Sequence, residues 1–297
     1  MRPETVVVTV TASGNIGFRD FTHPSAVGTQ MSNEATAQKP EAHLWFLDGS
    51  WWASLYSTAG NGHRIHRLDR LTQRWIDTGV LLDERPLSRQ DCFWNGEKLY
   101  IASRTGYLAS GTNRLLRYSY DPILQSYYLD PGFPVTLPGG GTESMTIAED
   151  TTGTFWVAYT MNSTVWVAHS LDDDMQWSDP FTLPATKGLP IDADDIAGVI
   201  AMNGKIGVFW TNQKDQADYF AYHPDTEGPT AGWVTETAVA GNSAADDHFN
   251  MKFANDGRLW VVMKTSRTGS NDILVGLLVR ATDGTWSPMY TIGTFGE

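Results

Sequence analysis

The sequence predicts an all-β fold, a β-propeller of five to six four-stranded blades. Runs with helical periodicity are absent, whereas short alternating segments rich in Val, Trp, Tyr and Thr recur between Gly, Asn and Asp residues. The pattern repeats about every fifty residues, and each repeat carries an aspartate followed by an aromatic residue. A β-sandwich would not require this aspartate and aromatic residue five times in the same phase.

Each repeat contains a turn followed by an aromatic and aliphatic strand. The five copies are LDGSWWASLY (47–56), WNGEKLYIAS (94–103), DTTGTFWVAY (150–159), MNGKIGVFW (202–210) and NDGRLWVVMK (255–264). Their glycines are Gly49, Gly96, Gly153, Gly204 and Gly257. Glycine suits these turns because it adopts a positive φ angle without the steric cost of a Cβ atom.

Further along each repeat, a strand ends in an aspartate, at Asp69, Asp121, Asp172, Asp225 and Asp283. The intervals between these aspartates are 52, 51, 53 and 58 residues. An aromatic residue follows each of them, at Trp75, Tyr127, Trp177, Trp233 and Trp286. We expect these rings to fill the wedge between neighbouring blades, where a large rigid side chain buries much area. A final short strand, as in DTGVLL (77–82), completes each unit.

These elements predict blades at 40–86, 87–139, 140–190, 191–241 and 242–297. Residues 1–39 hold a hairpin-like pair, TVVVTVTA (5–12) and IGFRDFT (16–22), which we expect to contribute to a partial blade or to ring closure. The N-terminus lacks the apolar core and cleavage site of a signal peptide. No apolar run reaches the roughly 18 residues that a membrane span needs, so membrane insertion is not expected.

Composition narrows the classes of partner. The chain has 297 residues and a formal net charge of −13, which repels nucleic acid phosphates and anionic membranes. The lone cysteine, Cys92, excludes an internal disulfide framework, and its aromatic neighbours favour a buried position.

SLDDDMQW (170–177) resembles the Asp box of sialidase-type propellers, a Ser/Thr-x-Asp-x-Gly-x-Thr-Trp pattern in an outer turn. Ser170, Asp172 and Trp177 match this pattern, while Asp174 and Gln176 depart from it. ATDGTW (281–286) and RLDRLTQRW (67–75) are more degenerate copies. In that family the box is structural, so the resemblance implies a fold and not a reaction.

The chain also resembles uncharacterised propeller modules of secreted or cell-surface bacterial proteins. RPLSRQDCFWNG followed by LYIASRTG, and ADDHFNMK followed by LWVVMKTS, carry this likeness. It implies an extracellular, cell-surface or virion-associated location.

Sialidase activity is not expected. The sialidase resemblance would imply three arginines around a substrate carboxylate, which a guanidinium binds through two parallel hydrogen bonds. Arg19 lies in GFRDF, where Asp20 and Phe21 replace the Arg-Ile-Pro motif of that family. Arg89 and Arg104 could face the channel, but no arginine occurs between Arg117 and Arg258.

One carboxylate recurs at the start of the innermost strand of each repeat, at Glu41, Asp91, Glu143, Asp195 and Asp247. The intervals are 50, 52, 52 and 52 residues. Three interpretations are open for this set. The carboxylates could accept backbone hydrogen bonds from the adjacent blade, they could bind a hard cation such as Ca²⁺ in the channel, or they could form part of a ligand site at the channel mouth.

The ligand-site interpretation adds residues near the same phase. Its candidates are Arg89, Asp91, Arg104, Glu143, Asp195, Asp246, His248, Asn250 and Lys252. Strand alternation would put Asp246, His248, Asn250 and Lys252 on one face, and Asp247, Phe249 and Met251 on the other. If the protein is an enzyme, Asp247, His248, Asp91 and Glu143 are the candidates for acid–base work on a sugar.

Without a recognised catalytic motif, the sequence favours a non-catalytic recognition module for a glycan or another protein surface, with no cofactor apart from the calcium alternative. The enzymatic alternative is a glycoside hydrolase or polysaccharide lyase that uses the acids at the channel mouth. A third alternative is a structural subunit or spacer of a surface filament or virion.

Overall fold

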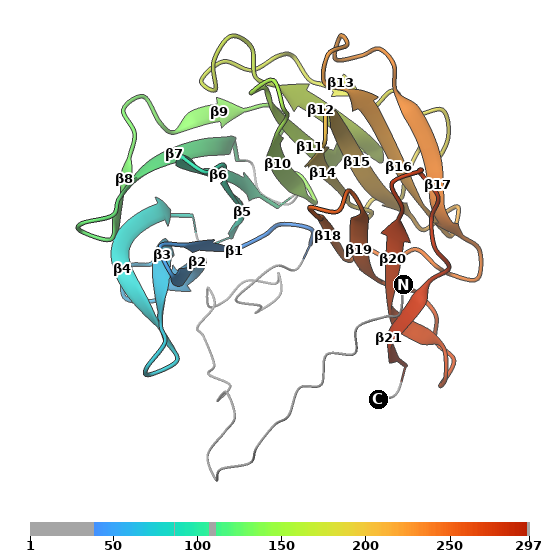
Figure 1. Cartoon of the computed structure of the whole chain (residues 1–297), viewed down its shortest axis with the longest axis horizontal. Coiled ribbons are helices and arrows are strands. Elements are labelled where there is room, and N and C mark those ends of the chain that lie inside the picture. The colour runs from blue at the N-terminus through green and yellow to red at the C-terminus, as the bar shows by residue number, and fades with distance from the viewer. Residues whose placement is uncertain (1–38, 86, 107–110, 296–297) are drawn as a thin grey trace.

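The computed structural model describes residues 39–85, 87–106 and 111–295. Within these ranges, 21 β-strands form five sheets and no helix occurs. The sheets are arranged around a central axis as the blades of a propeller (Figure 1). This confirms the predicted all-β propeller and sets the number of blades at five. The hairpin-like pair at 5–12 and 16–22 lies outside the described residues.

Each blade is an antiparallel sheet whose strands follow one another in chain order. Blade 1 consists of β1 (Leu44–Leu47), β2 (Ser50–Ser57), β3 (Gly62–Asp69) and β4 (Arg74–Asp83). Blade 2 consists of β5 (Ser88–Trp94), β6 (Lys98–Thr105), β7 (Asn113–Asp121), β8 (Ser126–Leu129) and β9 (Val135–Leu137), and its outer position is shared by β8 and β9, which both pair with β7.

The other three blades have four strands each. Blade 3 consists of β10 (Met145–Glu149), β11 (Phe155–Met161), β12 (Thr164–His169) and β13 (Phe181–Thr182). Blade 4 consists of β14 (Ala197–Met202), β15 (Lys205–Asn212), β16 (Ala217–Pro224) and β17 (Val234–Ala240). Blade 5 consists of β18 (Phe249–Phe253), β19 (Leu259–Lys264), β20 (Ile273–Arg280) and β21 (Tyr290–Thr294).

The repeated glycines follow a backbone requirement in the turn between the first two strands of each blade. All five adopt positive φ angles, which range from 68° at Gly204 to 103° at Gly96. A Cβ atom at Gly49 or Gly96 would meet nothing within 4 Å. The φ angle and not the available space therefore selects glycine at these turns.

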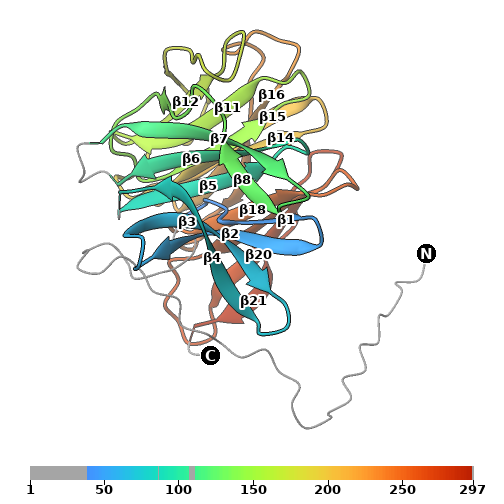
Figure 2. The ribbon, with the colours of Figure 1, turned by 90° about the vertical axis from the view of Figure 1, so that its left-hand side faces the viewer.

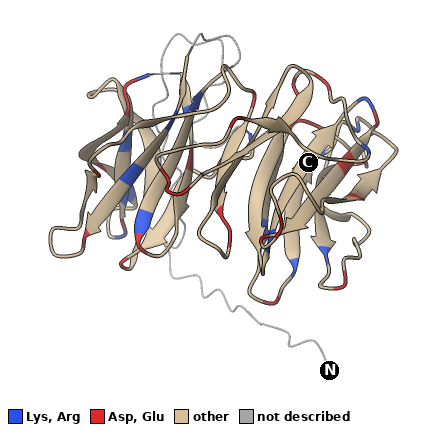
Figure 3. Ribbon diagram, turned by 90° about the horizontal axis from the view of Figure 1, so that it is seen from above, with Lys and Arg blue, Asp and Glu red and all other residues tan. Residues whose placement is uncertain are grey.

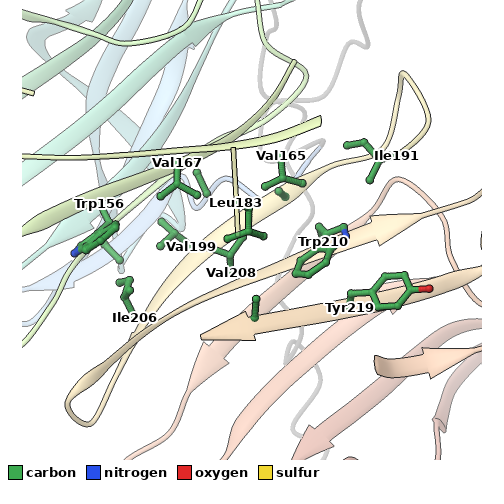
Figure 4. Close-up of a cluster of buried hydrophobic side chains, with 14 of the residues drawn as sticks. Trp156, Val165, Val167, Leu183, Ile191, Val199, Ile206, Val208, Trp210 and Tyr219 are labelled. Carbon is green, nitrogen blue, oxygen red and sulfur yellow. The ribbon is translucent and has the colours of Figure 1, made fainter. Parts of the chain in front are cut away.

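Four hydrophobic clusters hold the blades together, and each lies between two consecutive sheets. The cluster between blades 3 and 4 contains Trp156, Val167, Val208 and Trp210 (Figure 4). The equivalent clusters join blades 1 and 2, blades 2 and 3, and blades 4 and 5. Burial of these aromatic and branched side chains is the main favourable contribution to the stability of the ring.

The aromatic residue that follows each repeated aspartate packs towards the preceding blade in four of the five repeats. Tyr127 lies in the cluster between blades 1 and 2, and Trp177 packs against the cluster between blades 2 and 3. Trp233 and Trp286 occupy the equivalent places at the next two junctions. Trp75 of blade 1 belongs to none of the four clusters, since the blade before it in the ring is blade 5.

Acidic and basic residues are distributed differently along the blades. Many acidic positions fall on turns, while several of the basic positions lie within strands (Figure 3). In the part of the chain that the structure describes, no helix is present with the length and apolarity that a membrane crossing requires.

Candidate functional site

The candidate site lies at the end of the central channel where the innermost strands begin. β1, β5, β10, β14 and β18 are the innermost strands, and every blade repeats the same strand order, so their starting ends lie at one end of the ring (Figures 1 and 2). Contacts between blades connect Glu41, Asp91, Glu143 and Asp247 there. Asp195 instead binds within its own blade.

Glu41 precedes β1, and its carboxylate accepts a charge-assisted hydrogen bond from Nε of Arg104 on β6. It also accepts the backbone N–H of Met145 over 3.2 Å, and Arg104 Nη1 donates to the carbonyl of Thr142 over 3.0 Å. The side chains of Glu41 and Arg104 are only 1% and 3% exposed. This pair therefore joins blades 1, 2 and 3 and is not available to a ligand.

Asp91 lies within β5 and bridges the two neighbouring blades. Its carboxylate accepts the backbone N–H of Ala42 over 2.6 Å and the backbone N–H of Ile147 over 2.8 Å. Burial raises the pKa of Asp91 to about 7, although the two backbone donors favour the ionised form. Because each oxygen already has an N–H partner, Asp91 fits a connection between blades better than a group that acts on a ligand.

Lys39 forms ion pairs with two other carboxylates at the channel mouth, those of Glu143 and Asp247. Its ammonium lies 3.2 Å from Oε1 of Glu143 and contacts Oδ2 of Asp247, which links blade 3 to blade 5. Burial would lower the pKa of Lys39, but hydrogen bonds and charge attraction from Asp247 and Glu143 outweigh it and raise this pKa. Oε2 of Glu143 is buried and has no hydrogen-bond partner among the described residues.

His248 and Asp246 extend this network on the side of blade 5. Nδ1 of His248 lies 2.6 Å from the carboxylate of Asp247 and 3.1 Å from that of Asp246. These two contacts raise the pKa of His248 to about 9, so the imidazole is protonated at neutral pH. Asp246 also accepts hydrogen bonds from Lys264 and from Ser266. Burial would raise the pKa of Asp247, but the contacts with His248 and Lys39 hold it well below its ordinary value.

The expectation that Asp246 and Asp247 point to opposite faces is wrong. Strand β18 begins only at Phe249, so residues 246–248 precede it and do not follow strand alternation. One side-chain ligand atom from each of Asp246, Asp247 and His248 lies within 4.8 Å of the other two. All three residues therefore contribute to one cluster.

The remaining candidates are distributed around this cluster. Asn250 donates to the carbonyl of Pro40 over 3.3 Å, which connects blade 5 to the segment before blade 1. Arg89 donates to the carbonyl of Ser88 over 3.3 Å, and Lys252 is exposed further along β18. Asp195 accepts the backbone N–H groups of Asp192 and Gln213 at the entrance of blade 4.

A cavity of about 620 Å³ lies in the channel, lined by all five innermost strands and by the start of β2. Its wall is rich in aromatic residues, including Phe46, Trp51 and Trp94. Asp91, Asn250 and Lys252 border it, whereas the cluster around Lys39 lies outside its lining. The polar candidates thus divide between the mouth and this apolar cavity.

A substitution of Asp195 tests whether the repeated carboxylates serve as hydrogen-bond acceptors within the fold or as ligands of a metal ion. Replacing it with alanine would strand the N–H groups of Asp192 and Gln213, and we expect a loss of about 1–3 kcal/mol in the free energy of unfolding. Thermal melts of Asp195→Ala, with the exposed neighbour variant Asp194→Ala as control, measure this loss. Calcium binding by the five repeated carboxylates stays a prediction, and a chelator that destabilised the wild-type protein would favour it over hydrogen bonding alone.

Two buried histidines near the mouth predict sensitivity to acid. Nδ1 of His43 donates to the carbonyl of Ser54 over 3.3 Å, and His63 lies 3.2 Å from the hydroxyl of Ser88. Burial lowers the pKa of His43 to about 4 and that of His63 to about 3. The unfolded chain therefore binds more protons than the folded chain below about pH 6.5. Each histidine lowers the free energy of unfolding as the pH falls from 6.5 towards its folded-state pKa.

We expect His63→Gln to reduce the loss of stability between pH 6.5 and 4, by on the order of 1 kcal/mol per pH unit. Asp91 changes the free energy of unfolding in the opposite direction, because its raised pKa stabilises the folded protein on acidification. Denaturant titrations of wild type and variant at several pH values isolate the histidine contribution, and parallel pH profiles of the two proteins would contradict it.

Lys39 and Lys264 are the residues at the site that sequence patterns missed. Lys39 stands two residues before Glu41, the offset that Arg89 has from Asp91, so a cation at this phase occurs in two repeats. That weak recurrence is the one signal that could have indicated Lys39. Lys264 ends β19 and reaches Asp246 only through the fold.

No family model matches the sequence, and no curated protein is significantly similar to it. Solved structures do match. The GH43 protein BlXynB from Bacillus licheniformis aligns with 86% of this chain and 55% of its own, at 12% identity and a TM-score of 0.51. The periplasmic gluconolactonase PpgL from Pseudomonas aeruginosa aligns over 84% of this chain and 69% of its own, at 12% identity and a TM-score of 0.56.

A bifunctional GH43-CE protein from Bacteroides eggerthii covers 91% of this chain and 36% of its own, at 13% identity and a TM-score of 0.51. At such identities the comparisons show the propeller fold, and this chain spans about half of the length of the GH43 protein from Bacillus. They do not confirm the resemblance to sialidase-type propellers.

These comparisons contradict the expected non-catalytic recognition module. The three similar structures are a GH43 protein, a gluconolactonase and a bifunctional GH43-CE protein. The prediction failed because it required a recognised sequence motif. Glu143 and Asp247 come from repeats that lie far apart in the chain, and no local motif encodes such a pair.

Proposed function

We propose that this protein is a glycoside hydrolase, with Glu143 and Asp247 as its two reacting carboxylates. The observation that carries this proposal is that a single ammonium, that of Lys39, contacts both groups. The two oxygens are therefore closer together than the roughly 6.5–9.5 Å at which an inverting pair accommodates a water molecule. A short separation suits the retaining reaction, in which one carboxylate attacks the sugar and the other transfers the proton.

The surroundings of the two carboxylates indicate which one attacks the sugar and which one transfers the proton. Asp247 is kept ionised by His248 and Lys39, as a nucleophile must be. Glu143 is the second carboxylate that contacts the ammonium of Lys39, and we assign to its carboxyl group the transfer of a proton to and from the glycosidic oxygen. A bound sugar must displace the Lys39 ammonium or accept its hydrogen bonds, because that group lies between the carboxylates.

We propose a glycan as the natural partner and, following the resemblance to surface modules, an extracellular or surface location. A glycosidase with a sialidase-type arginine trio is not proposed, because Arg104 is already committed to Glu41.

The test is a screen of aryl glycosides and polysaccharides for released phenol or reducing ends. Any substrate found is then tested with Glu143→Gln and Asp247→Asn. Asp256→Asn, which removes an exposed carboxylate paired with Arg258 in the β18–β19 turn, is the matched control. Turnover that both site variants retain at the control rate would refute the assignment.

A further inference from the structure

The channel cavity extends to the end of the ring opposite Glu143 and Asp247. On blade 5 its lining runs from Asn250, the second residue of β18, to Phe253, the last. On blade 2 it reaches Trp94, the last residue of β5. Its volume of about 620 Å³ falls within the range of roughly 300–1,000 Å³ that is usual for small-molecule sites. Glu143 and Asp247 do not line it, so the cavity is a space separate from the proposed reaction site.

Blade 1 supplies an aromatic pair to the wall of this cavity. Phe46 and Trp51 are partners across β1 and β2, and their rings lie 5.3 Å apart at an angle of 65°. Trp45 and Trp52 pack into the cluster with blade 2. By strand alternation, Phe46 and Trp51 therefore point away from blade 2, and they are 55% and 47% exposed. Two large rings that are half exposed beside a cavity present flat apolar faces to a ligand.

Blade 5 supplies hydrogen-bonding groups to the same cavity. Met251 and Phe253 pack against the cluster with blade 4. Asn250 and Lys252 therefore lie on the opposite face of β18, and the hydrogen bond from Asn250 to Pro40 shows that this face is turned towards blade 1. Lys252 is exposed and makes no hydrogen bond or ion pair with the described residues. Its ammonium is therefore available to a ligand.

The aromatic pair and Lys252 face the junction between blades 5 and 1. Hydrophobic clusters fill the four junctions from blade 1 to blade 5 in chain order, and no cluster of described residues fills this one. The two blades flank the lower side of the ring in Figure 1. The wall of the cavity thus combines apolar rings on blade 1 with an ammonium and an amide on blade 5, whereas apolar side chains meet at the other four junctions.

We propose that this cavity is a second carbohydrate-binding site, which holds a neutral polysaccharide away from the reacting carboxylates. The class of its occupant rests on the proposed glycoside hydrolase function. A sugar ring has an apolar face of C–H groups and a rim of hydroxyls. It can therefore stack on Phe46 or Trp51 while a hydroxyl accepts a hydrogen bond from Lys252. Apolar walls with a few polar groups that fix orientation are the usual composition of a ligand site.

Charge and distance favour a neutral polymer over an acidic or a short glycan. The net charge of −13 repels polyanionic glycans. Lys252 follows Asp247 by five residues, so their Cα atoms are at most about 18 Å apart. Several linked sugars span that distance, whereas an aryl glycoside does not. Attachment at both places increases the affinity for a polymer through the effective concentration of its second contact.

Affinity electrophoresis through gels that contain xylan, arabinan, galactan or a β-glucan tests the second site. Glu143→Gln is the background protein, so that turnover does not consume the polymer, and we expect a neutral polymer to retard it. Adding Trp51→Ala or Lys252→Ala should weaken this binding about tenfold, the scale of one stacking or charge-assisted contact. The matched controls are Tyr128→Ala, an aromatic residue 50% exposed on β8, and Lys187→Ala, an exposed lysine outside the cavity lining. Both controls should bind as the background protein does, and thermal melts verify that each variant is folded.

Site variants that bind as tightly as the controls would overturn the proposal. So would a background protein that no neutral polymer retards, or one that polygalacturonate retards equally. A dimer in light scattering that dissociates with Trp51→Ala would identify a second copy of the chain as the occupant instead. The outcome is independent of the reaction: binding that depends on Trp51 stands without any turnover, and turnover that depends on Glu143 and Asp247 stands without this site.

Discussion

Glu143→Gln is expected to lower the turnover of a glycoside with a poor leaving group by about 10²–10⁴-fold, the usual contribution of a positioned acid–base group. Glutamine keeps the size of the side chain but cannot transfer the proton. Asp247, the other carboxylate that contacts the Lys39 ammonium, is assigned the attack on the sugar, so it would not replace the proton transfer by Glu143.

The leaving group separates the roles of the two carboxylates. Dinitrophenolate is a leaving group that departs without receiving a proton. A dinitrophenyl glycoside should therefore restore much of the rate of the first step, the attack on the sugar, in Glu143→Gln. The same substrate should not rescue Asp247→Asn, which lacks the attacking oxygen. Equal rescue of both variants would contradict the division of roles, and burst kinetics with the dinitrophenyl substrate would measure each step.

Glu41→Ala is expected to destabilise the folded protein by about 3–5 kcal/mol, since it leaves the Arg104 guanidinium buried without its counter-charge. For a domain of this size the loss corresponds to a drop in Tm on the order of 10 °C. Glu84→Ala is the matched control, because Glu84 pairs with Arg114 at the surface and such pairs contribute about 0–1 kcal/mol.

Replacing both partners, as in Glu41→Met with Arg104→Met, should recover much of the stability that Glu41→Ala loses, because no unpaired charge then remains. Chemical denaturation of the wild-type protein and the three variants provides the free energies. A loss in Glu41→Ala no larger than that in Glu84→Ala would show that Arg104 finds other compensation.

Repetition made the fold accessible from the sequence. The glycines from Gly49 to Gly257 mark turns that need a positive φ, and the aromatic residues from Tyr127 to Trp286 mark the junctions between blades. Both requirements are local or recur with the repeat, so five copies reinforce one another. The same regularity placed a carboxylate at the entrance of each innermost strand.

The equal spacing of those carboxylates did not reveal their different partners. Asp91 binds two backbone N–H groups, Glu41 binds an arginine, and Glu143 shares an ammonium with Asp247. Those partners come from other blades, and spacing along one repeat carries no information about them. The alternation of side chains expected for a strand also did not apply to residues 246–248, because they lie in a loop before β18.

The sequence by itself determined the all-β propeller and the positions of its turns, its aromatic wedges and its ring of carboxylates, because each of these follows from requirements that repeat along the chain. Only the tertiary structure decided the number of blades, the role of Lys39 and the pairing of Glu143 with Asp247. Those features depend on the closure of the ring, which brings side chains from distant repeats within hydrogen-bonding distance and sets how much water reaches them.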